Sequence, residues 1–213
     1  MYQWSFQHKT PSSLVTIHAK SIVVPAKDLL SYENKHIFDR LCRIGCVNFN
    51  KKWSCPPYSP PYSKLSDSYS YLLLILLYSY LDQFDYIQNK YTKVRAGNVI
   101  LKSLVERSLR RLENIFDGIM ISNGSCRLCR PCTLKLDKTE CKRPEKMRYS
   151  MESLGLNVIK ISTDYFEHKL LWYRKKKVPL YTSVVSGLLT NSDIDLDLIE
   201  TRYLISTAQS FRK

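Results

Sequence analysis

The sequence predicts an α+β fold, with a small mixed sheet flanked by helices and an inserted cysteine-rich loop. An apolar run at residues 71–81 has the composition of a buried strand, and residues 98–117 carry apolar side chains at helical period. Strands and helices also follow one another without the regular strand–helix–strand rhythm of a parallel sheet. Because 44% of the 213 residues are hydrophobic, the chain can fill one core, and we expect a single domain over residues 1–213.

The first half of the chain supplies strands and one helix around a proline-rich loop. Residues 14–17 and 21–24 are rich in β-branched side chains and predict a short strand or hairpin that ends at Pro25. Residues 28–40 have a helical apolar stripe, and residues 48–70 form a loop rich in Pro, Ser and Tyr. The apolar run that follows is far shorter than the roughly twenty residues that span a bilayer, so we expect no membrane segment.

The second half is built around the helix at residues 98–117. A short strand at Ile119–Ile121 follows it, and Asn123-Gly124 turns the chain into the cysteine-rich loop. Pro144 is placed to open a helix over residues 145–154 that ends at Gly155. The remaining predicted elements are a strand at 158–162, a helix at 165–173, a strand at 181–185 and a final amphipathic helix at 193–204.

Several enzyme classes are excluded by the motifs that the sequence lacks. It has six glycines, and none of them forms a phosphate-binding Gly-rich loop. The nucleophile motif Gly-x-Ser-x-Gly and the zinc-protease motif His-Glu-x-x-His are also absent. Any catalysis must therefore come from a metal, and the sequence leaves open whether the protein is an enzyme.

The cysteine count points to metal ligation. The first residues show no secretory signal, and a reducing cytoplasm, where we expect the protein, disfavours disulfides. Seven cysteines cannot all be paired in any case. The thiols are therefore more plausible as metal ligands or redox groups than as a disulfide framework.

Four of the cysteines read C-x2-C-x2-C-x8-C, which is the spacing by which bacterial ferredoxins wrap a [4Fe–4S] cluster. We expect this ferredoxin-like loop and the helix after it to form a cluster-binding subregion over residues 123–155. Zinc is the alternative, although structural zinc sites prefer two separated C-x2-C pairs. The four predicted cluster ligands are Cys126, Cys129, Cys132 and Cys141.

The other three cysteines, Cys42, Cys46 and Cys55, read C-x3-C-x8-C and predict a second metal centre. Three thiolates leave one coordination position, which an exogenous ligand could fill, as water does in catalytic zinc sites. His36 or Asp39 could instead supply a fourth protein ligand. A third interpretation is that these are ordinary buried core cysteines.

The cysteine motifs resemble a family described as predicted metal-binding proteins, the domain of unknown function 2284, found mainly in anaerobic bacteria and archaea. The resemblance covers about residues 42–158 and implies metal binding by all seven cysteines. It implies no particular reaction. The matching runs are Trp53-Ser54-Cys55-Pro56-Pro57, the segment from Gly124 through Cys126, Cys129, Cys132 and Cys141, and residues 144–152.

The chain is strongly basic, with 33 Lys and Arg against 19 Asp and Glu, and about +9 of its net charge of +14 lies within residues 90–148. Cations near a thiolate-bound cluster stabilise its reduced form. The leading interpretation is therefore an iron–sulfur protein that transfers electrons to a redox partner protein. The alternatives are an open-site cluster enzyme for sulfur transfer or reduction, and a zinc-stabilised nucleic-acid-binding module.

Overall fold

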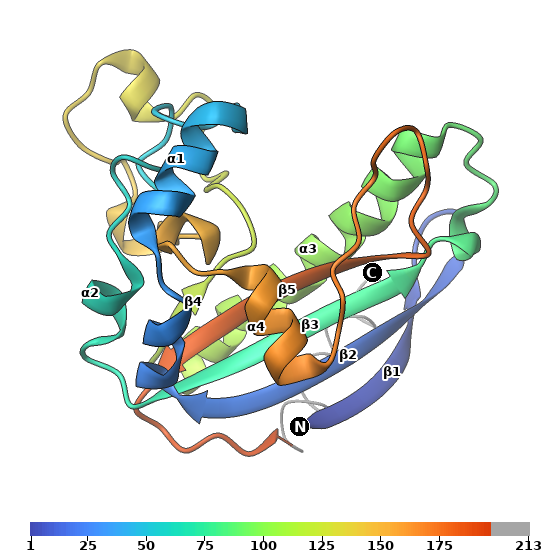
Figure 1. Ribbon diagram of the computed structural model, residues 1–213, viewed down its shortest axis with the longest axis horizontal. Helices are drawn as coiled ribbons and strands as arrows, with labels where there is room; N and C mark the ends of the chain where they lie inside the picture. Colours follow the sequence, from blue (N-terminus) through green and yellow to red (C-terminus); the bar gives the residue numbers. More distant parts are fainter. Residues whose placement is uncertain (197–213) are drawn as a thin grey trace.

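A computed structural model describes residues 1–196 and confirms the α+β class. Five strands form one sheet in the order β1-β2-β3-β5-β4 (Figure 1). All four strand pairings are antiparallel, so the sheet is more regular than the mixed sheet expected from the sequence. The strands are β1 (Tyr2–Lys9), β2 (Leu14–Pro25), β3 (Tyr71–Tyr80), β4 (Ile119–Ile121) and β5 (Tyr181–Thr190).

The central strand β3 confirms the prediction of a buried strand in the apolar run. All six side chains from Leu72 to Leu77 are fully buried. Leu73, Ile75 and Leu77 pack into one hydrophobic core, while the alternate leucines pack into a second core on the opposite face. A strand covered on both faces has no polar side, and this is why the sequence shows a continuous apolar run.

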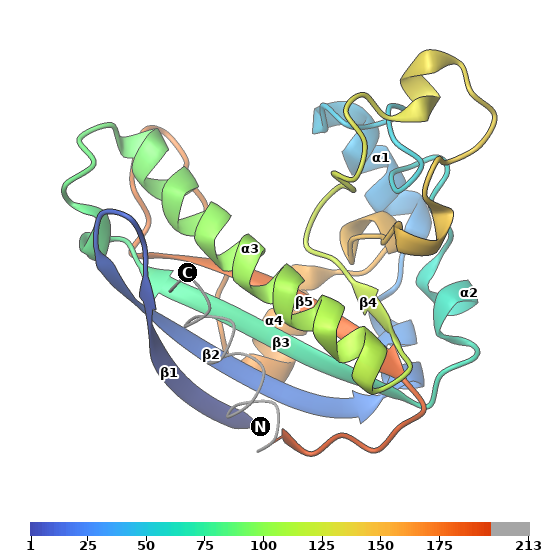
Figure 2. The ribbon, with the colours of Figure 1, turned by 180° about the vertical axis from the view of Figure 1, so that it is seen from behind.

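Helix α3 (Lys90–Ile115) covers one face of the sheet, as Figure 2 shows. It confirms the predicted helix but begins earlier, where the Asn89 side chain accepts a hydrogen bond of 2.9 Å from the Thr92 N–H. Its buried stripe contacts the strands directly. The residues of that stripe are Leu101, Leu104, Val105, Leu109 and Leu112.

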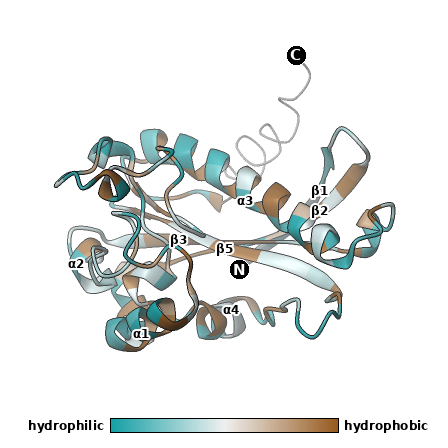
Figure 3. Ribbon diagram, turned by 90° about the horizontal axis from the view of Figure 1, so that it is seen from above, coloured by the Kyte–Doolittle hydropathy of each residue, from teal (hydrophilic) through white to brown (hydrophobic). Residues whose placement is uncertain are grey.

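The opposite face is covered by short helices, and Figure 3 shows α3 on one side of the strands and α1 and α4 on the other. These elements are the 3₁₀ helices Ala26–Tyr32 and Glu152–Leu154, with α2 (Tyr62–Ser66) and α4 (Val158–Phe166). Helix α1 (Lys35–Gly45) stands at one end of this layer and has no buried residue. The cysteine loop after β4 lies beside it (Figure 1).

Five of the predicted elements are wrong or incomplete. The helix at 28–40 is a 3₁₀ helix followed by α1, because the Asn34 side chain accepts a hydrogen bond from the Ile37 N–H and starts a new helix there. The helix at 145–154 is two short 3₁₀ helices, Pro144–Lys146 and Glu152–Leu154. The N-terminal strand β1 was not predicted, and the two segments at 14–17 and 21–24 are parts of β2.

The predicted strand at 158–162 is helix α4, and the predicted helix at 165–173 does not continue past Phe166. The β-branched residues of this segment favour a strand, but the Asn157 side chain caps a helix by accepting from the Lys160 N–H at 3.1 Å. The strand at 181–185 is confirmed and extends to Thr190. Most of the predicted helix at 193–204 lies outside the described residues.

Candidate metal centre

The four cysteines of the second motif converge on one small cavity. Cys126, Cys129, Cys132 and Cys141 all line a space of about 10 Å³, together with Lys52 and several further residues. Burial raises the pKa of the Cys141 thiol, and the other three thiols raise it further. The motif therefore brings together the four side chains that its spacing predicted to share a centre.

Residues 52–54, shortly before the first proline pair, hold the four-cysteine loop in place through hydrogen bonds. Lys52 donates from Nζ to the carbonyl oxygen of Cys126 at 2.6 Å, and the Cys126 N–H donates to the Ser54 hydroxyl at 3.0 Å. Trp53 donates from Nε1 to the Thr133 hydroxyl at 3.0 Å, and Thr133 itself donates to a carbonyl at the far end of the loop. The two cysteine motifs are thus joined by side chains that the sequence alone does not pair.

The other three cysteines also come near one another. Cys42 lies in the last turn of α1 and Cys46 caps it, with the Cys46 N–H donating to the Cys42 carbonyl at 3.0 Å. Cys55 is only 6% exposed. Burial raises the pKa of Cys42 to about 11, and the charges of Cys46 and Cys55 contribute to this rise. Burial likewise raises the pKa of Cys55, and the charges of Cys46 and Cys126 raise it further. The group Cys42, Cys46 and Cys55 therefore adjoins the four-cysteine loop.

The donor set suits a thiophilic metal, but the thiols are not arranged around a single ion. Within residues 1–196, no three His, Cys, Asp or Glu side chains form a group that could hold one metal ion. The space between the four thiols holds about one water molecule. A bound metal centre would therefore rearrange the loop, as expected where metal binding and folding are coupled.

Asp39 and His36, the two residues proposed as a fourth ligand, differ in their surroundings. Asp39 is paired with Lys35, four residues earlier on α1, and its charge is the weakest of the causes that raise the pKa of Cys42. His36 is exposed on the same helix. The assignment of the fourth position, like that of the seven thiol ligands, stays a prediction.

A buried carboxylate that the sequence did not single out anchors the chain after the cysteine loop. Glu113 on α3 is 8% exposed and accepts hydrogen bonds from Arg148, from Arg110 at 3.2 Å and from the Met120 N–H at 2.7 Å. Arg110 also donates to the carbonyl of Lys146 at 2.8 Å. These contacts fasten residues 145–148 to α3. Helical periodicity gave no signal for this role, because it depends on residues distant in the sequence.

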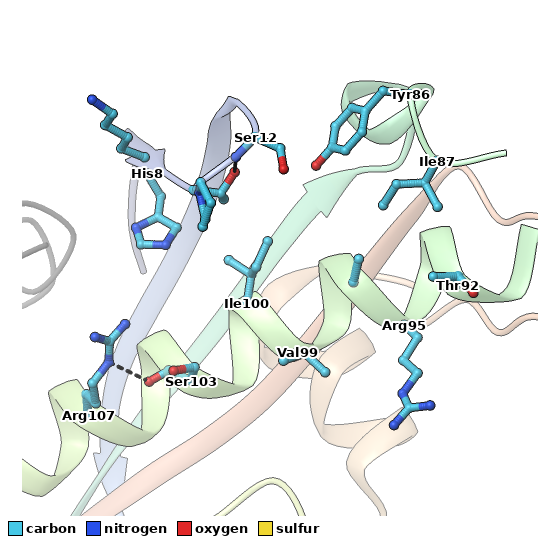
Figure 4. Close-up of a pocket in the computed structure, with 14 residues that line it drawn as sticks. His8, Ser12, Tyr86, Ile87, Thr92, Arg95, Val99, Ile100, Ser103 and Arg107 are labelled. Carbon is cyan, nitrogen blue, oxygen red and sulfur yellow. Dashed lines mark hydrogen bonds between the residues drawn. The ribbon is translucent and has the colours of Figure 1, made fainter. Parts of the chain in front are cut away.

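A larger cavity, of about 810 Å³, is lined by the β1–β2 turn and by α3. Figures 1 and 2 show that this turn and the start of α3 lie at the other end of the sheet from the cysteine loops. Figure 4 shows that the cavity is lined by His8 of β1, by Ser12 in the β1–β2 turn, by Tyr86 before α3, and by α3 itself. Arg107 donates from Nε to the Ser103 carbonyl at 3.2 Å along this helix. None of the lining residues is a cysteine, so this cavity belongs to no predicted metal site.

Fold and site together define a cysteine-rich α+β protein in which the set of three cysteines and the set of four cysteines adjoin at one end of an antiparallel sheet. The chain belongs to the family described as Predicted metal-binding protein (DUF2284), whose model matches residues 27–189. This confirms the resemblance seen in the cysteine motifs and extends it to β5. No curated protein and no solved structure matches the chain. No helix within residues 1–196 is long and apolar enough to cross a membrane.

Proposed function

We propose that this member of the metal-binding family is a cytoplasmic iron–sulfur protein that holds a [4Fe–4S] cluster through Cys126, Cys129, Cys132 and Cys141. The observation that carries the proposal is that these four thiols line one cavity. Three of them come from one loop at equal steps of three residues, the pattern with which ferredoxins surround a cube. When bound, such a cluster supplies one-electron transfer.

The surroundings of the thiols favour a cluster over a zinc ion. Three of the cysteines follow one another at steps of three residues, whereas structural zinc sites prefer two separated C-x2-C pairs. Lys52 and Arg143 also line the cavity, so two cations face the negative charge that four thiolates bring. Trp53 also lines the cavity, so part of its wall is an aromatic ring.

The three remaining cysteines would hold a second centre. Cys55 lies close enough to Cys126 for each charge to act on the other, which gives electrons a short route between the two groups. Cys46 is exposed at the end of α1. Beside it, Ile37, Leu41 and Ile44 form an apolar stripe on α1 that is between 42% and 77% exposed. Such a stripe next to a redox centre suits the docking of a redox partner protein.

Metal and sulfide analysis after anaerobic purification tests this function. We expect iron and acid-labile sulfide in near-equal amounts, with visible absorption that bleaches on reduction. Cys132→Ala should lose the cluster, whereas Ser125→Ala, a matched change in the same loop, should keep it. Zinc as the sole stoichiometric metal, without sulfide, would contradict the proposal and favour the nucleic-acid-binding alternative.

A further inference from the structure

A third cavity, of about 560 Å³, is lined by Cys42 and Cys46. Its walls come from α1, the middle of α3, the start of α4, the segment after α4 and strand β5. A volume of this size accommodates a small organic molecule. We refer to it below as the cysteine cleft.

One part of the cysteine cleft is apolar. Phe38 and Leu41 of α1 line it together with Leu171 and Trp172, which come from the segment between α4 and β5. Trp172 is 48% exposed, and Val184 on β5 is buried beneath the cleft. An indole ring that stays half-exposed beside aliphatic side chains gains free energy when an apolar ligand covers it.

The polar part of the cleft contains a lysine without a counter-charge in contact. Lys102 is half-buried, and within residues 1–196 it makes no ion pair or hydrogen bond. A Cβ added at Gly124 would lie 3.8 Å from its Nζ, so the ammonium reaches the start of the cysteine loop. Glu152 also lines the cleft, and its charge partly offsets the burial that lowers the pKa of Lys102, but Glu152 is exposed and no ion pair within residues 1–196 joins it to Lys102. The desolvation of an ammonium is offset best by an anion.

Two amide side chains beside Lys102 are held in fixed orientations. Asn98 donates from Nδ2 to the Thr182 hydroxyl at 3.2 Å, and Asn123 donates from Nδ2 to the Ser186 hydroxyl at 3.0 Å. Both asparagines line the cleft. The polar end is thus set before any ligand arrives, which lowers the entropic cost of binding.

We propose that the cysteine cleft binds a small organic carboxylate with an apolar body, its carboxylate on Lys102 and its body against Trp172. Binding itself requires no metal. Only the further step, that this carboxylate is the substrate or ligand of the Cys42/Cys46/Cys55 centre, rests on the proposed function.

Titration with 3-phenylpropanoate, followed by tryptophan fluorescence and calorimetry, tests the proposal. The carboxylate should bind at least about tenfold more tightly than 3-phenylpropanamide, which has the same shape and no charge. Lys102→Met should remove this preference, while Lys90→Met, an equal charge change at the exposed start of α3, should keep it. Trp172→Phe should abolish the fluorescence change although Trp4 and Trp53 remain.

Equal affinity for the acid and the amide, or unchanged carboxylate binding by Lys102→Met, would overturn the proposal. The metal content of each variant separates this inference from the iron–sulfur function. A protein that binds the carboxylate but purifies without iron would refute the proposed function alone. A protein with iron and sulfide that does not prefer the carboxylate would refute the cleft proposal alone.

Discussion

Lowering the pH from 7 to 5 should destabilise the protein through one buried histidine, His168. Its side chain is 7% exposed and its ring lies 4.8 Å from those of Tyr78 and Tyr181. One ring nitrogen, Nε2, is 2.8 Å from the hydroxyl of Ser183, which lines the cysteine cleft. Burial, and after it the charge of Lys20, lowers the pKa of His168 from 6.5 to about 4.

The direction and size of the effect follow from these two pKa values. Below pH 6.5 the unfolded chain takes up a proton at this histidine, but the folded chain does so only near pH 4. The stability that the neutral ring contributes is therefore present above pH 6.5 and is lost as the pH falls towards 4. At about 1.4 kcal/mol per pKa unit the total is about 3 kcal/mol, of which about 2 kcal/mol is lost by pH 5.

Urea unfolding at pH 7 and pH 5 measures this loss. Other groups that titrate between pH 5 and pH 7 change in both proteins, so the comparison is between wild type and His168→Gln. The variant should lose about 2 kcal/mol less than wild type on acidification. His36→Gln removes an exposed histidine and should behave like wild type. An equal loss in wild type and His168→Gln would refute the reasoning.

Three further outcomes are expected. Glu113→Gln should lower the free energy of unfolding by about 3 kcal/mol in urea titrations, because two arginines lose a buried counter-charge, whereas the exposed Glu106→Gln on the same helix should change it little. Chelation or Cys132→Ala should speed amide exchange first in the four-cysteine loop, and unchanged protection there would contradict the coupling of metal binding to its structure. Gly155→Ala should destabilise strongly in thermal unfolding, since its φ is +89° and a Cβ would lie 2.7 Å from a neighbouring Cα. Gly45→Ala, with nothing within 4 Å, is the control and should unfold at the wild-type temperature.

The parts of the fold that could be predicted are those fixed by local pattern. The run 72–77 is apolar on both faces, and α3 repeats its apolar residues at helical period, so each element is recognisable without its neighbours. Helix α4 shows the opposite case. Its β-branched residues favour a strand, and the helix forms because of the Asn157 cap and because Ile161 and Phe166 pack against the sheet.

The candidate site also has one part that local sequence predicts and another part that only the fold reveals. Cysteine spacing was enough to place Cys126, Cys129, Cys132 and Cys141 around one cavity, because short loops constrain their own ends. Lys102 could not be identified, since on its own helix it is one basic residue among several. Only the fold sets it beside Cys42 in the same cleft, sixty positions away along the chain.

The hydrogen bonds that join Lys52 and Ser54 to the backbone of Cys126 have a thermodynamic consequence. They join two loops that are more than seventy residues apart in the sequence, so whatever orders one loop presents ready-made partners to the other. Free-energy linkage is reciprocal, so any factor by which a centre in one of the two proposed sites changes the affinity of the other is returned by the second to the first. Because these hydrogen bonds let one ordered loop order the other, we expect the two proposed centres to fill cooperatively rather than independently.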